Sequence, residues 1–541
     1  MKQFDVKMLL GEHWWGGSTF YGTQNPFTAD SDFHCNFRIQ AFNQAMPFFL
    51  SDRGRYIWSE EPFQVDIAGG TLHFEFDDTS SVTLTEAGKT LKDAYEAAMN
   101  AHFKFDGTKL CDTFFSVAQY NSWMEFHCNQ TQEGILKYAH GIVDHGFTPG
   151  IIMVDEGWQV NYGEWEFNRA KFPDPKAMCD ELHALGFKLM LWVVPYVNCA
   201  GDTFLMASSP WENPDNINRF MRVKSDNKFE GRDCQPAIIH WWGGYSAVLD
   251  FTNPVDCDYM EKQLRHLMDA YGVDGFKFDG GQLDGYAFTN IINGELVTDK
   301  TPAELNIAWN EFGTRFPFHE FKDTWKGGGK ASIQRICDKK HSWYDWGLNT
   351  LIPCSLVQNL IGHPFTCPDM IGGGEGYEWQ DPVDDELFIR TAQVSAFFPM
   401  MQFSRAPWRV LHSPEAMQLT IEAAKIHDRY ADELLALVRK AEKDGDPIMR
   451  ALEFDFPGEG LAEVTDAFMW GPQLLVAPVV EQGAVTRRVR LPRGNGDTPI
   501  TWIWEGEGPL ATGTKFEGGT EITVEAPLSC IPRFRRGELM I

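Results

Sequence analysis

Between about Thr113 and Arg405 the chain repeats one unit, which is a short apolar run, a loop with Trp, Asp or Gly, and a segment with helical periodicity. The apolar runs begin at Thr113, Gly150, Lys188, Ser246, Val273, Ser332, Pro364 and Phe397. Runs such as GIIMVDEGW do not alternate apolar with polar residues, which is typical of parallel strands buried on both faces. Eight strand–helix units of this kind predict an α/β fold with a closed (β/α)8 TIM barrel.

The segments between these runs carry the punctuation of helices. The segment 173–186 has Pro near its start and Gly at its end, and 254–272 shows the same pattern. Proline suits the first turn of a helix and glycine suits the residue after its last turn, so both segments are predicted to be helices.

The two flanks lack this alternation and contain short strand-like runs separated by Gly and Pro turns. Such runs indicate β-sandwiches on both sides of the barrel. We therefore expect an N-terminal β-sandwich over residues 1–108, the barrel over 109–412, a linking helix over 413–445 and a C-terminal β-sandwich over 446–541.

The charge balance excludes several classes of partner. Lys and Arg total 47 and Asp and Glu total 76, which gives a formal net charge of −29. This excess repels nucleic acid and anionic membrane surfaces and favours a neutral small substrate. No apolar run reaches the length of a membrane span, and the N-terminal stretch lacks a signal-peptide core. The sequence does not determine the oligomeric state, and a homo-oligomer is possible.

The cysteines and histidines give no indication of a metal or of disulfides. The 11 cysteines are odd in number and scattered, which predicts reduced thiols in a cytoplasmic protein. No histidine group shows ligand spacing, and the WKGGGKAS stretch lacks the first Gly of a phosphate loop. We therefore expect neither a catalytic metal nor a cofactor.

Polar residues follow most of the predicted strands, at the end of the barrel where catalytic residues lie in this fold. They are Asp155, Trp192, Asp250, Lys277, Asp279, Arg335, Asp369 and Arg405. Lys277 and Asp279 are two positions apart on one strand, so both side chains point to the same face. A cation beside Asp279 lowers the pKa of its carboxyl and keeps it ionised, as a nucleophile requires.

The surroundings of Asp369 predict the opposite behaviour. It lies among apolar residues and glycines, which raises the pKa of a carboxyl and keeps its proton. Two carboxyls whose pKa values are driven apart are the chemistry of glycoside hydrolysis. An isolated Asp at a strand end is more often a helix cap, so the prediction depends on the two occurring together.

Four tryptophans lie beside predicted strand ends, and two interpretations of them stay open. They are Trp158, Trp192, Trp343 and Trp408. Each is either a core aromatic or a flat apolar face that stacks on a sugar ring. Trp14 and Trp15, near the N-terminus, either close over the site from the first sandwich or pack inside it.

These motifs resemble those of glycoside hydrolase family 31, and the resemblance extends over most of the chain. VDGFKFDGG is similar to the nucleophile strand of the family in its Lys-x-Asp form, and PDMIGG is similar to the acid/base loop of the branch that contains α-galactosidases. IIMVDEGWQ is similar to the second strand, LDFTNP to the fourth, and GPQLLVAPVV to the C-terminal sandwich. The resemblance implies the same order of sandwich, barrel and sandwich.

The resemblance also implies an activity and roles for individual residues. Asp279 would be the nucleophile and Asp369 the acid/base of a retaining, exo-acting α-glycosidase that cleaves a small oligosaccharide or glycoside. The residues implied to bind the sugar are Asp155, Trp192, Lys277, Arg335, Trp343, Arg405 and Trp408. The α-glucosidases of the family usually have Trp where this chain has Lys277, and their eighth strand ends in Arg-Asn-His where this chain reads QFSRAPW.

The resemblance favours an α-galactoside as substrate, because the most similar motifs are those of the galactosidase-containing branch. α-Glucosides, α-xylosides and N-acetyl-α-galactosaminides stay open, since one or two residues distinguish one sugar hydroxyl. A different class of function stays open too, namely a non-catalytic carbohydrate-binding protein that retains the barrel.

Overall fold

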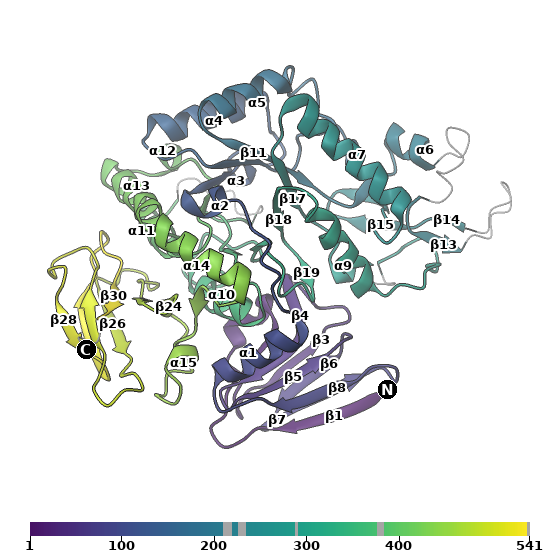
Figure 1. Cartoon of the computed structure of the whole chain (residues 1–541). Coiled ribbons are helices and arrows are strands. Elements are labelled where there is room, and N and C mark those ends of the chain that lie inside the picture. Colours follow the sequence, from purple (N-terminus) through teal and green to yellow (C-terminus); the bar gives the residue numbers. More distant parts are fainter. Residues whose placement is uncertain (209–218, 225–233, 287–289, 376–382, 538–541) are drawn as a thin grey trace.

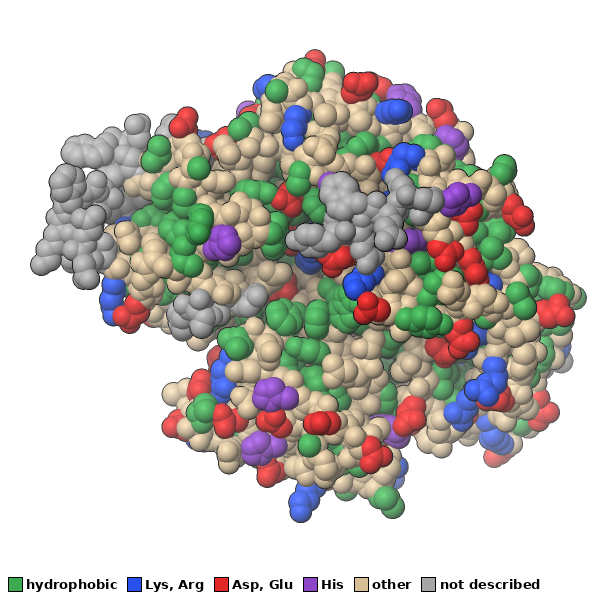
Figure 2. All heavy atoms as spheres, turned by 180° about the vertical axis from the view of Figure 1, so that it is seen from behind, with side chains coloured by type: hydrophobic (Ala, Val, Ile, Leu, Met, Phe, Trp, Pro, Cys, Tyr) green, Lys and Arg blue, Asp and Glu red, His purple; other side chains and the backbone are tan. Residues whose placement is uncertain are grey.

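The computed structural model describes the whole chain except residues 209–218, 225–233, 287–289, 376–382 and 538–541. The N-terminal sheets (purple) and the C-terminal sheets (yellow) flank a central barrel in teal and green (Figure 1). No helix in the described part of the chain is long and apolar enough to cross a membrane. Acidic side chains are spread over the face seen in Figure 2 rather than gathered in one patch.

An eight-stranded parallel sheet forms the nearly closed barrel that the sequence predicts. Its order is β21-β20-β18-β17-β11-β10-β9-β22. The strands are β9 (Gln119–Asn121), β10 (Ile151–Val154), β11 (Lys188–Val193), β17 (Gly275–Phe278), β18 (Phe318–Phe321), β20 (Ile333–Arg335), β21 (Thr366–Cys367) and β22 (Gln402–Phe403). A bridge between Ile371 and Phe403 brings the chain after β21 against β22, which completes the ring.

Helices alternate with these strands and cover the outside of the barrel (Figure 1). The main ones are α4 (Gln132–Asp144), α5 (Pro175–Ala184), α7 (Pro254–Tyr271), α9 (Pro302–Gly313), α10 (Leu351–Leu360) and α11 (Asp385–Ser395). The α5 and α7 helices begin with proline, after the side-chain caps Asp174 and Asn253. The α7 helix ends at Gly272, whose φ of +91° favours glycine, so both helices predicted from punctuation are confirmed.

One predicted strand lies outside the barrel, and one barrel strand was missed. The run from Ser246 belongs to β16 (Gly244–Val248), which pairs antiparallel with β12 (Tyr196–Asn198) and β15 (Ile238–Trp241). Its Val248 belongs to a separate small core that contains Trp192 and Tyr196, and its Ala247 and Leu249 belong to the main core. The barrel strand that the sequence analysis missed is β18, so the barrel still has eight strands. Gly275 packs against β18 so closely that a Cβ on it would lie 2.1 Å from the backbone oxygen of Phe318.

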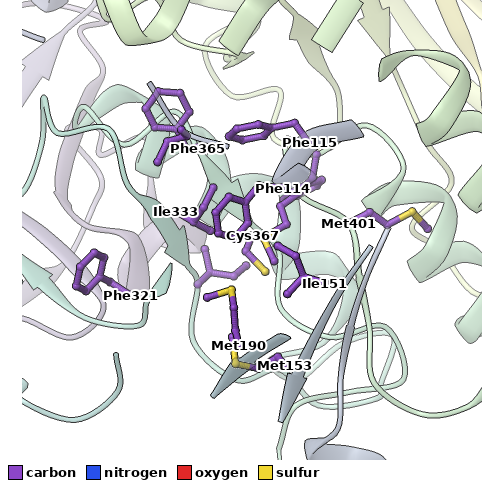
Figure 3. Packing of buried hydrophobic residues seen from close by; sticks show 14 of the residues in the cluster. Phe114, Phe115, Ile151, Met153, Met190, Phe321, Ile333, Phe365, Cys367 and Met401 are labelled. Atoms are coloured by element: carbon purple, nitrogen blue, oxygen red, sulfur yellow. The ribbon is translucent and has the colours of Figure 1, made fainter. Parts of the chain in front are cut away.

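Large apolar side chains pack around the barrel strands (Figure 3). Those labelled in Figure 3 are Phe114, Phe115, Ile151, Met153, Met190, Phe321, Ile333, Phe365, Cys367 and Met401. Burial of each large apolar side chain contributes roughly 1.5–3 kcal/mol to folding. This packing supports the strand ends that carry the polar residues.

Two sheets form the N-terminal sandwich. One has the order β1-β7-β6-β3, and the other has the order β19-β4-β5-β8 with β2 on β4. The strands are β1 (Lys2–Lys7), β2 (Trp14–Ser18), β3 (Phe33–Asn36), β4 (Gln44–Ser51), β5 (Arg55–Ser59), β6 (Gln64–Ala68), β7 (Thr71–Phe76), β8 (Val82–Glu86) and β19 (Thr324–Trp325). The helix α1 (Leu91–His102) follows, although the sequence indicated no helix there. Its capping box, formed by Thr90 and Asp93, is a signal that could have located it.

The C-terminal part consists of a six-stranded sheet, β23-β24-β25-β30-β27-β28, and the pair β26-β29. The strands are β23 (Met449–Arg450), β24 (Phe468–Trp470), β25 (Leu474–Val476), β26 (Thr486–Leu491), β27 (Thr501–Trp504), β28 (Lys515–Glu517), β29 (Thr520–Glu525) and β30 (Arg533–Arg536). One apolar cluster, which includes Trp502 and Val489, packs between them as in a sandwich.

The linking segment is two helices rather than the single helix expected over 413–445. They are α13 (Pro414–Arg429) and α14 (Ala431–Asp444). The break falls at Tyr430, whose hydroxyl donates to Glu505 and accepts from Arg533 of the C-terminal part. A tertiary contact therefore sets this break, and neither proline nor glycine marks it in the sequence.

The remaining elements are short. They are η1 (Thr19–Gln24), α2 (Thr113–Ser116), α3 (Trp123–Phe126), α6 (Asp202–Ser208), β13 (Arg222–Lys224), β14 (Cys234–Pro236), α8 (Leu283–Tyr286), η4 (Leu348–Thr350), α12 (Pro407–Val410) and α15 (Leu452–Asp455).

Candidate active site

A cavity of about 430 Å³ opens at the carboxyl ends of the barrel strands. Its described lining residues are Trp123, His127, Cys128, Asn129, Asp155, Glu156, Trp192, Trp242, Lys277, Asp279, Lys322, Asp338, Met370 and Glu375. They come from the ends of seven of the eight barrel strands and the loops that follow them, so the barrel brings together residues that are far apart in the sequence.

Asp279 directly follows β17 and is held by hydrogen bonds on both carboxylate oxygens. The indole Nε1 of Trp192 donates to Oδ2 at 2.9 Å, and the backbone N–H of Gly280 donates to Oδ1 at 2.8 Å. Burial alone would raise the pKa of Asp279, but the cations of Lys322 and Lys277 and these hydrogen bonds outweigh it and hold the pKa below its ordinary value. Asp279 is therefore a fixed, ionised carboxylate in the cavity.

Lys277 connects Asp279 to a second carboxylate. Its Nζ lies 2.9 Å from Oδ2 of Asp155 and 3.8 Å from Oδ2 of Asp279. The side-chain amide of Asn121 also donates to Asp155, at 3.0 Å. Burial opposes the charge on Lys277, but Asp155 and Asp279 raise its pKa above the ordinary value. The prediction that Lys277 and Asp279 point to the same face of one strand agrees with this geometry.

A further carboxylate, that of Asp338, faces the cavity from the loop after β20. The Nζ of Lys322 donates to Oδ2 of Asp338 at 2.7 Å, and the side chain of Asp338 is 32% exposed. Burial opposes the charge on Lys322, while Asp279 and Asp338 raise its pKa well above the ordinary value. The charge on the Lys322 ammonium group therefore interacts with the carboxylates of Asp279 and Asp338.

Asp369 is not among the described residues that line this cavity. Its Oδ1 accepts from Arg335 at 2.7 Å and its Oδ2 from the backbone N–H of Lys339 at 2.7 Å. Burial raises the pKa of Asp369 to about 7, and the guanidinium of Arg335 opposes this. The direction agrees with the sequence-based expectation, but both oxygens are occupied by protein groups, so Asp369 braces the loop behind the cavity.

The other predicted sugar-binding residues are also set back from the cavity. Arg335 is fully buried and forms a further pair with Glu320 at 2.6 Å. Trp343 donates to Asp384 at 3.0 Å, and Trp408 stacks on His145 with ring centroids 4.8 Å apart. These contacts fit structural roles. Of the predicted binding residues, the lining includes Asp155, Trp192 and Lys277.

Arg405 is buried next to two histidines. Its charge lowers the pKa values of His127 and His341, in both cases after the larger effect of burial. His127 lines the cavity, so Arg405 lies behind one of its walls. Trp158 is fully buried and donates to the carbonyl of Trp192, which supports the core interpretation of this residue.

The N-terminal tryptophans are packing residues. Trp14 is fully buried in the core of the first sandwich, with the guanidinium of Arg55 5.2 Å from its ring centroid. Trp15 is buried in the main core cluster. Neither is among the described residues of the cavity lining, so the packing alternative holds.

A group of aromatic residues at the cavity was missed in the sequence, namely Trp242, Trp241 and Tyr162, which we call the aromatic wall. Trp242 is 54% exposed at the tip of the β15–β16 hairpin, close enough to Glu156 to oppose the rise that burial causes in the pKa of its carboxyl. Tyr162 also donates to Glu156, and its ring lies 4.7 Å from that of Trp241. Burial raises the pKa of Glu156 above its ordinary value. This wall offers a flat apolar face next to a carboxyl that hydrogen-bonds.

Asp338, Lys322 and Glu156 are the main lining residues that the sequence analysis missed. Asp338 ends the run SIQRICD and could have been found there, and Glu156 follows Asp155 directly. Lys322 follows β18, which was itself missed. Among the described residues no group of His, Cys, Asp or Glu is arranged to hold a metal ion.

Together these groups suit acid–base and nucleophilic chemistry on a neutral, hydroxyl-rich ligand. Carboxylates that include Asp279 and Asp338, the cations of Lys277 and Lys322, and flat aromatic faces are all present in the lining. Hydroxyl groups bind well to such charged donors and acceptors, and sugar rings pack on aromatic faces.

Comparison with known proteins places the chain in a family. The profile of the Glycosyl hydrolases family 31 TIM-barrel domain matches residues 115–430, and that of the Glycosyl hydrolase family 31 C-terminal domain matches 445–541. The chain is 33% identical over 375 residues to the myogenesis-regulating glycosidase of Mus musculus, covering 67% of this chain and 49% of that protein.

Two further comparisons cover more of the chain. It is 24% identical over 527 residues to an alpha-xylosidase of Emericella nidulans, covering 90% of this chain and 61% of that protein. The solved cycloalternan-degrading enzyme from Trueperella pyogenes, in complex with covalent intermediate, has the same fold, with a TM-score of 0.79, 17% identity and coverage of 99% and 78%. The chain spans from 33% to 61% of the length of the curated relatives it matches. Since the barrel profile alone matches more than half of its residues, the chain belongs to glycoside hydrolase family 31.

Proposed function

We propose that the protein is a retaining, exo-acting α-glycosidase in which Asp279 is the nucleophile and Asp338 is the acid/base. The observation that carries this proposal is that both carboxylates face one cavity and that Lys322 contacts one of them and influences the other. Pairs of carboxyls on opposite sides of a scissile bond are the usual equipment of glycosidases.

The proposed reaction has two displacement steps. In the first, Asp338 donates a proton to the glycosidic oxygen while Asp279 attacks the anomeric carbon, so the aglycone leaves as an alcohol and a glycosyl ester forms on Asp279. In the second, Asp338 takes a proton from water, whose oxygen displaces Asp279 and releases the sugar with its configuration retained. A related fold solved with a covalent intermediate supports this two-step course.

The proposal assigns the acid/base role to Asp338 instead of Asp369, the residue expected from the sequence. A general acid has to reach the leaving oxygen, directly or through one water. Asp338 lines the cavity and is partly exposed, whereas Asp369 accepts from Arg335 and from the Lys339 backbone and is 3% exposed. The elevated pKa of Asp369 follows from its burial and does not require a catalytic role.

The sugar in the cavity would be bound by the remaining charged and aromatic groups. Asp155 and Lys277 are placed to hold hydroxyl groups near Asp279, where bonds that strengthen in the transition state contribute most. Trp242 offers the exposed aromatic face. A terminal α-galactoside of a small oligosaccharide stays our preferred substrate, supported by the resemblance to the galactosidase-containing branch. α-Glucosides, α-xylosides and N-acetyl-α-galactosaminides are the alternatives, and one relative is named an alpha-xylosidase.

A panel of nitrophenyl α-glycosides tests the activity. We expect release of nitrophenol from one member, with the α-galactoside first, and none from Asp279→Ala. Release from no member, together with measurable sugar binding, would favour the non-catalytic carbohydrate-binding protein instead.

Azide separates the two carboxylate roles. Asp279→Ala with azide should form a glycosyl azide of inverted configuration, because azide replaces the missing nucleophile. Asp338→Ala should still react with substrates that carry good leaving groups, and azide should then give a product of retained configuration. If Asp338→Ala behaves as wild type and Asp369→Ala gives the retained azide, the assignment to Asp338 is wrong.

A further inference from the structure

Two amide side chains of the N-terminal sandwich reach the carboxyl ends of the barrel strands. Asn43 and Gln44 lie at the start of β4, and both are buried. The Nδ2 of Asn43 donates to the carbonyl oxygen of Lys322 at 2.9 Å, and the Nε2 of Gln44 donates to the same oxygen at 3.1 Å. Gln44 also donates to the carbonyl of Arg335 at 2.8 Å. One amide therefore connects the ends of two neighbouring barrel strands, β18 and β20.

The orientation of Gln44 is fixed by a third element. The Nε2 of Gln358, on α10, donates to the Oε1 of Gln44 at 2.8 Å and to the carbonyl of Gln334 at 3.1 Å. Because the oxygen of Gln44 faces Gln358, its nitrogen faces the two strand ends. Removal of this amide would leave the buried carbonyl of Arg335 without its described side-chain donor, while the carbonyl of Lys322 would keep Asn43.

The chain immediately after Lys322 is also held by the sandwich. In β19, Thr324 pairs with Gln44 and Trp325 pairs with Ala45 in a parallel register. The backbone N–H of Asn43 donates to the carboxylate of Asp323 at 2.7 Å. The backbone of Lys322 thus lies between β18, a strand of the barrel, and β19, a strand of the sandwich sheet.

We propose that Asn43 and Gln44 are positioning residues of the active site, which hold the Lys322 ammonium in place between Asp279 and Asp338. This inference rests on the proposed function of the two carboxylates. The charged groups that face Lys322 are Asp279, Asp338 and Asp369, with the cation of Lys277 nearby. Lys322 contacts Asp338 at 2.7 Å, and a displacement of about 1 Å at such a site lowers turnover by up to about 100-fold.

The test compares three variants in the full chain. Asn43→Gly removes the side-chain bond to Lys322 and suits the backbone, because Asn43 has a φ of +56°. Gln44→Leu removes the second bond at similar volume. The control is Gln64→Leu on β6, whose amide contacts only Asp66 of its own sheet at 3.4 Å among the bonds described. We expect kcat to fall about 10- to 100-fold for the first two variants with KM nearly unchanged, and the control to match wild type.

A double-mutant cycle with Lys322→Met distinguishes positioning from general destabilisation. If Asn43 acts through Lys322, Asn43→Gly should lower kcat less than about twofold once Lys322 is already Met. Asn43→Gly and Gln44→Leu should also move the acid limb of the kcat/KM profile in the direction that Lys322→Met moves it.

The outcomes separate this inference from the proposed function. Should Asn43→Gly keep the wild-type kcat and pH profile, or should its loss add fully to that of Lys322→Met, the positioning role is refuted while the glycosidase stands. If Gln44→Leu does not fold, Asn43→Gly alone decides. Wild-type protein that hydrolyses no member of the panel refutes the proposed function, and the positioning role with it.

Discussion

Asp338→Asn and Asp369→Asn should separate catalysis from stability. Asp338 accepts one described hydrogen bond, from Lys322, and an amide oxygen can still accept it. Loss of a general acid lowers the rate about 10²- to 10⁴-fold, which is roughly 3–5 kcal/mol in the barrier at 1.36 kcal/mol per tenfold. We therefore expect Asp338→Asn to unfold like wild type and to lose most of its turnover on substrates with poor leaving groups.

Asp369→Asn should show the reverse pattern. The substitution removes the charge that pairs with Arg335, which is fully buried, and leaves Glu320 as the other carboxylate in contact with it. Because Glu320 still compensates the guanidinium, the cost is that of a lost hydrogen bond to a charged group, roughly 1.5–3 kcal/mol. Asn tolerates the positive φ of +83° at this position, so the backbone adds little strain. Turnover per folded molecule should fall far less than in Asp338→Asn.

The assay measures both quantities on the same preparations. Denaturant unfolding reports the change in stability, and initial rates with a nitrophenyl glycoside and with an unactivated disaccharide report the chemistry. Replacement of the exposed Asp345 by Asn is the control, because its side chain is 85% exposed and pairs with Lys340 at the surface. A stable Asp369→Asn protein with abolished turnover on the disaccharide, beside an active Asp338→Asn protein, would refute the reasoning.

Three more variants test other contacts of the cavity. Lys277→Met removes a cation that holds the pKa of Asp279 low, so the pKa of Asp279 should rise. The acid limb of the pH profile of kcat/KM should then move to higher pH. An acid limb that does not move would contradict this expectation. Trp242→Ala should raise KM about 3- to 10-fold with a small change in kcat, and titration with the free sugar should show the same loss of affinity. Trp408→Ala should lower stability by up to about 3 kcal/mol through its lost contact with His145 and leave KM unchanged, and a changed KM would restore Trp408 to the sugar site.

The barrel could be predicted because its strands are buried on both faces. Runs without alternation are rare elsewhere, and the Lys277–Asp279 pair needed only the period of two residues in a strand to be placed correctly. The strand β18 was missed because its sequence, FHEF, contains His and Glu, which argue against burial. In the structure Glu320 pairs with Arg335 and the ring of His319 bonds to the Phe316 carbonyl, and such tertiary partners leave no mark in the sequence.

The acid/base role that the sequence predicted for Asp369 differs from the one proposed here for a related reason. Apolar neighbours and glycines around Asp369 are equally compatible with a catalytic acid and with a buried brace, because both raise the pKa of a carboxyl. What distinguishes them is access to the cavity, which depends on the direction of one loop. The contacts of Trp343 and Trp408 favour the core interpretation, which closeness to a strand end in the sequence could not distinguish from sugar stacking.

The pairing of β19 with β4 has a consequence for the modular character of the protein. A short piece of the barrel chain completes a sheet of the sandwich, so the boundary between the two parts runs through a shared set of backbone hydrogen bonds. Parts joined in this way cannot drift relative to each other or be exchanged independently without exposing a sheet edge. The N-terminal sandwich and the barrel are therefore joined through one hydrogen-bonded sheet, and the sandwich is a structural support of the barrel rather than an accessory attached to it.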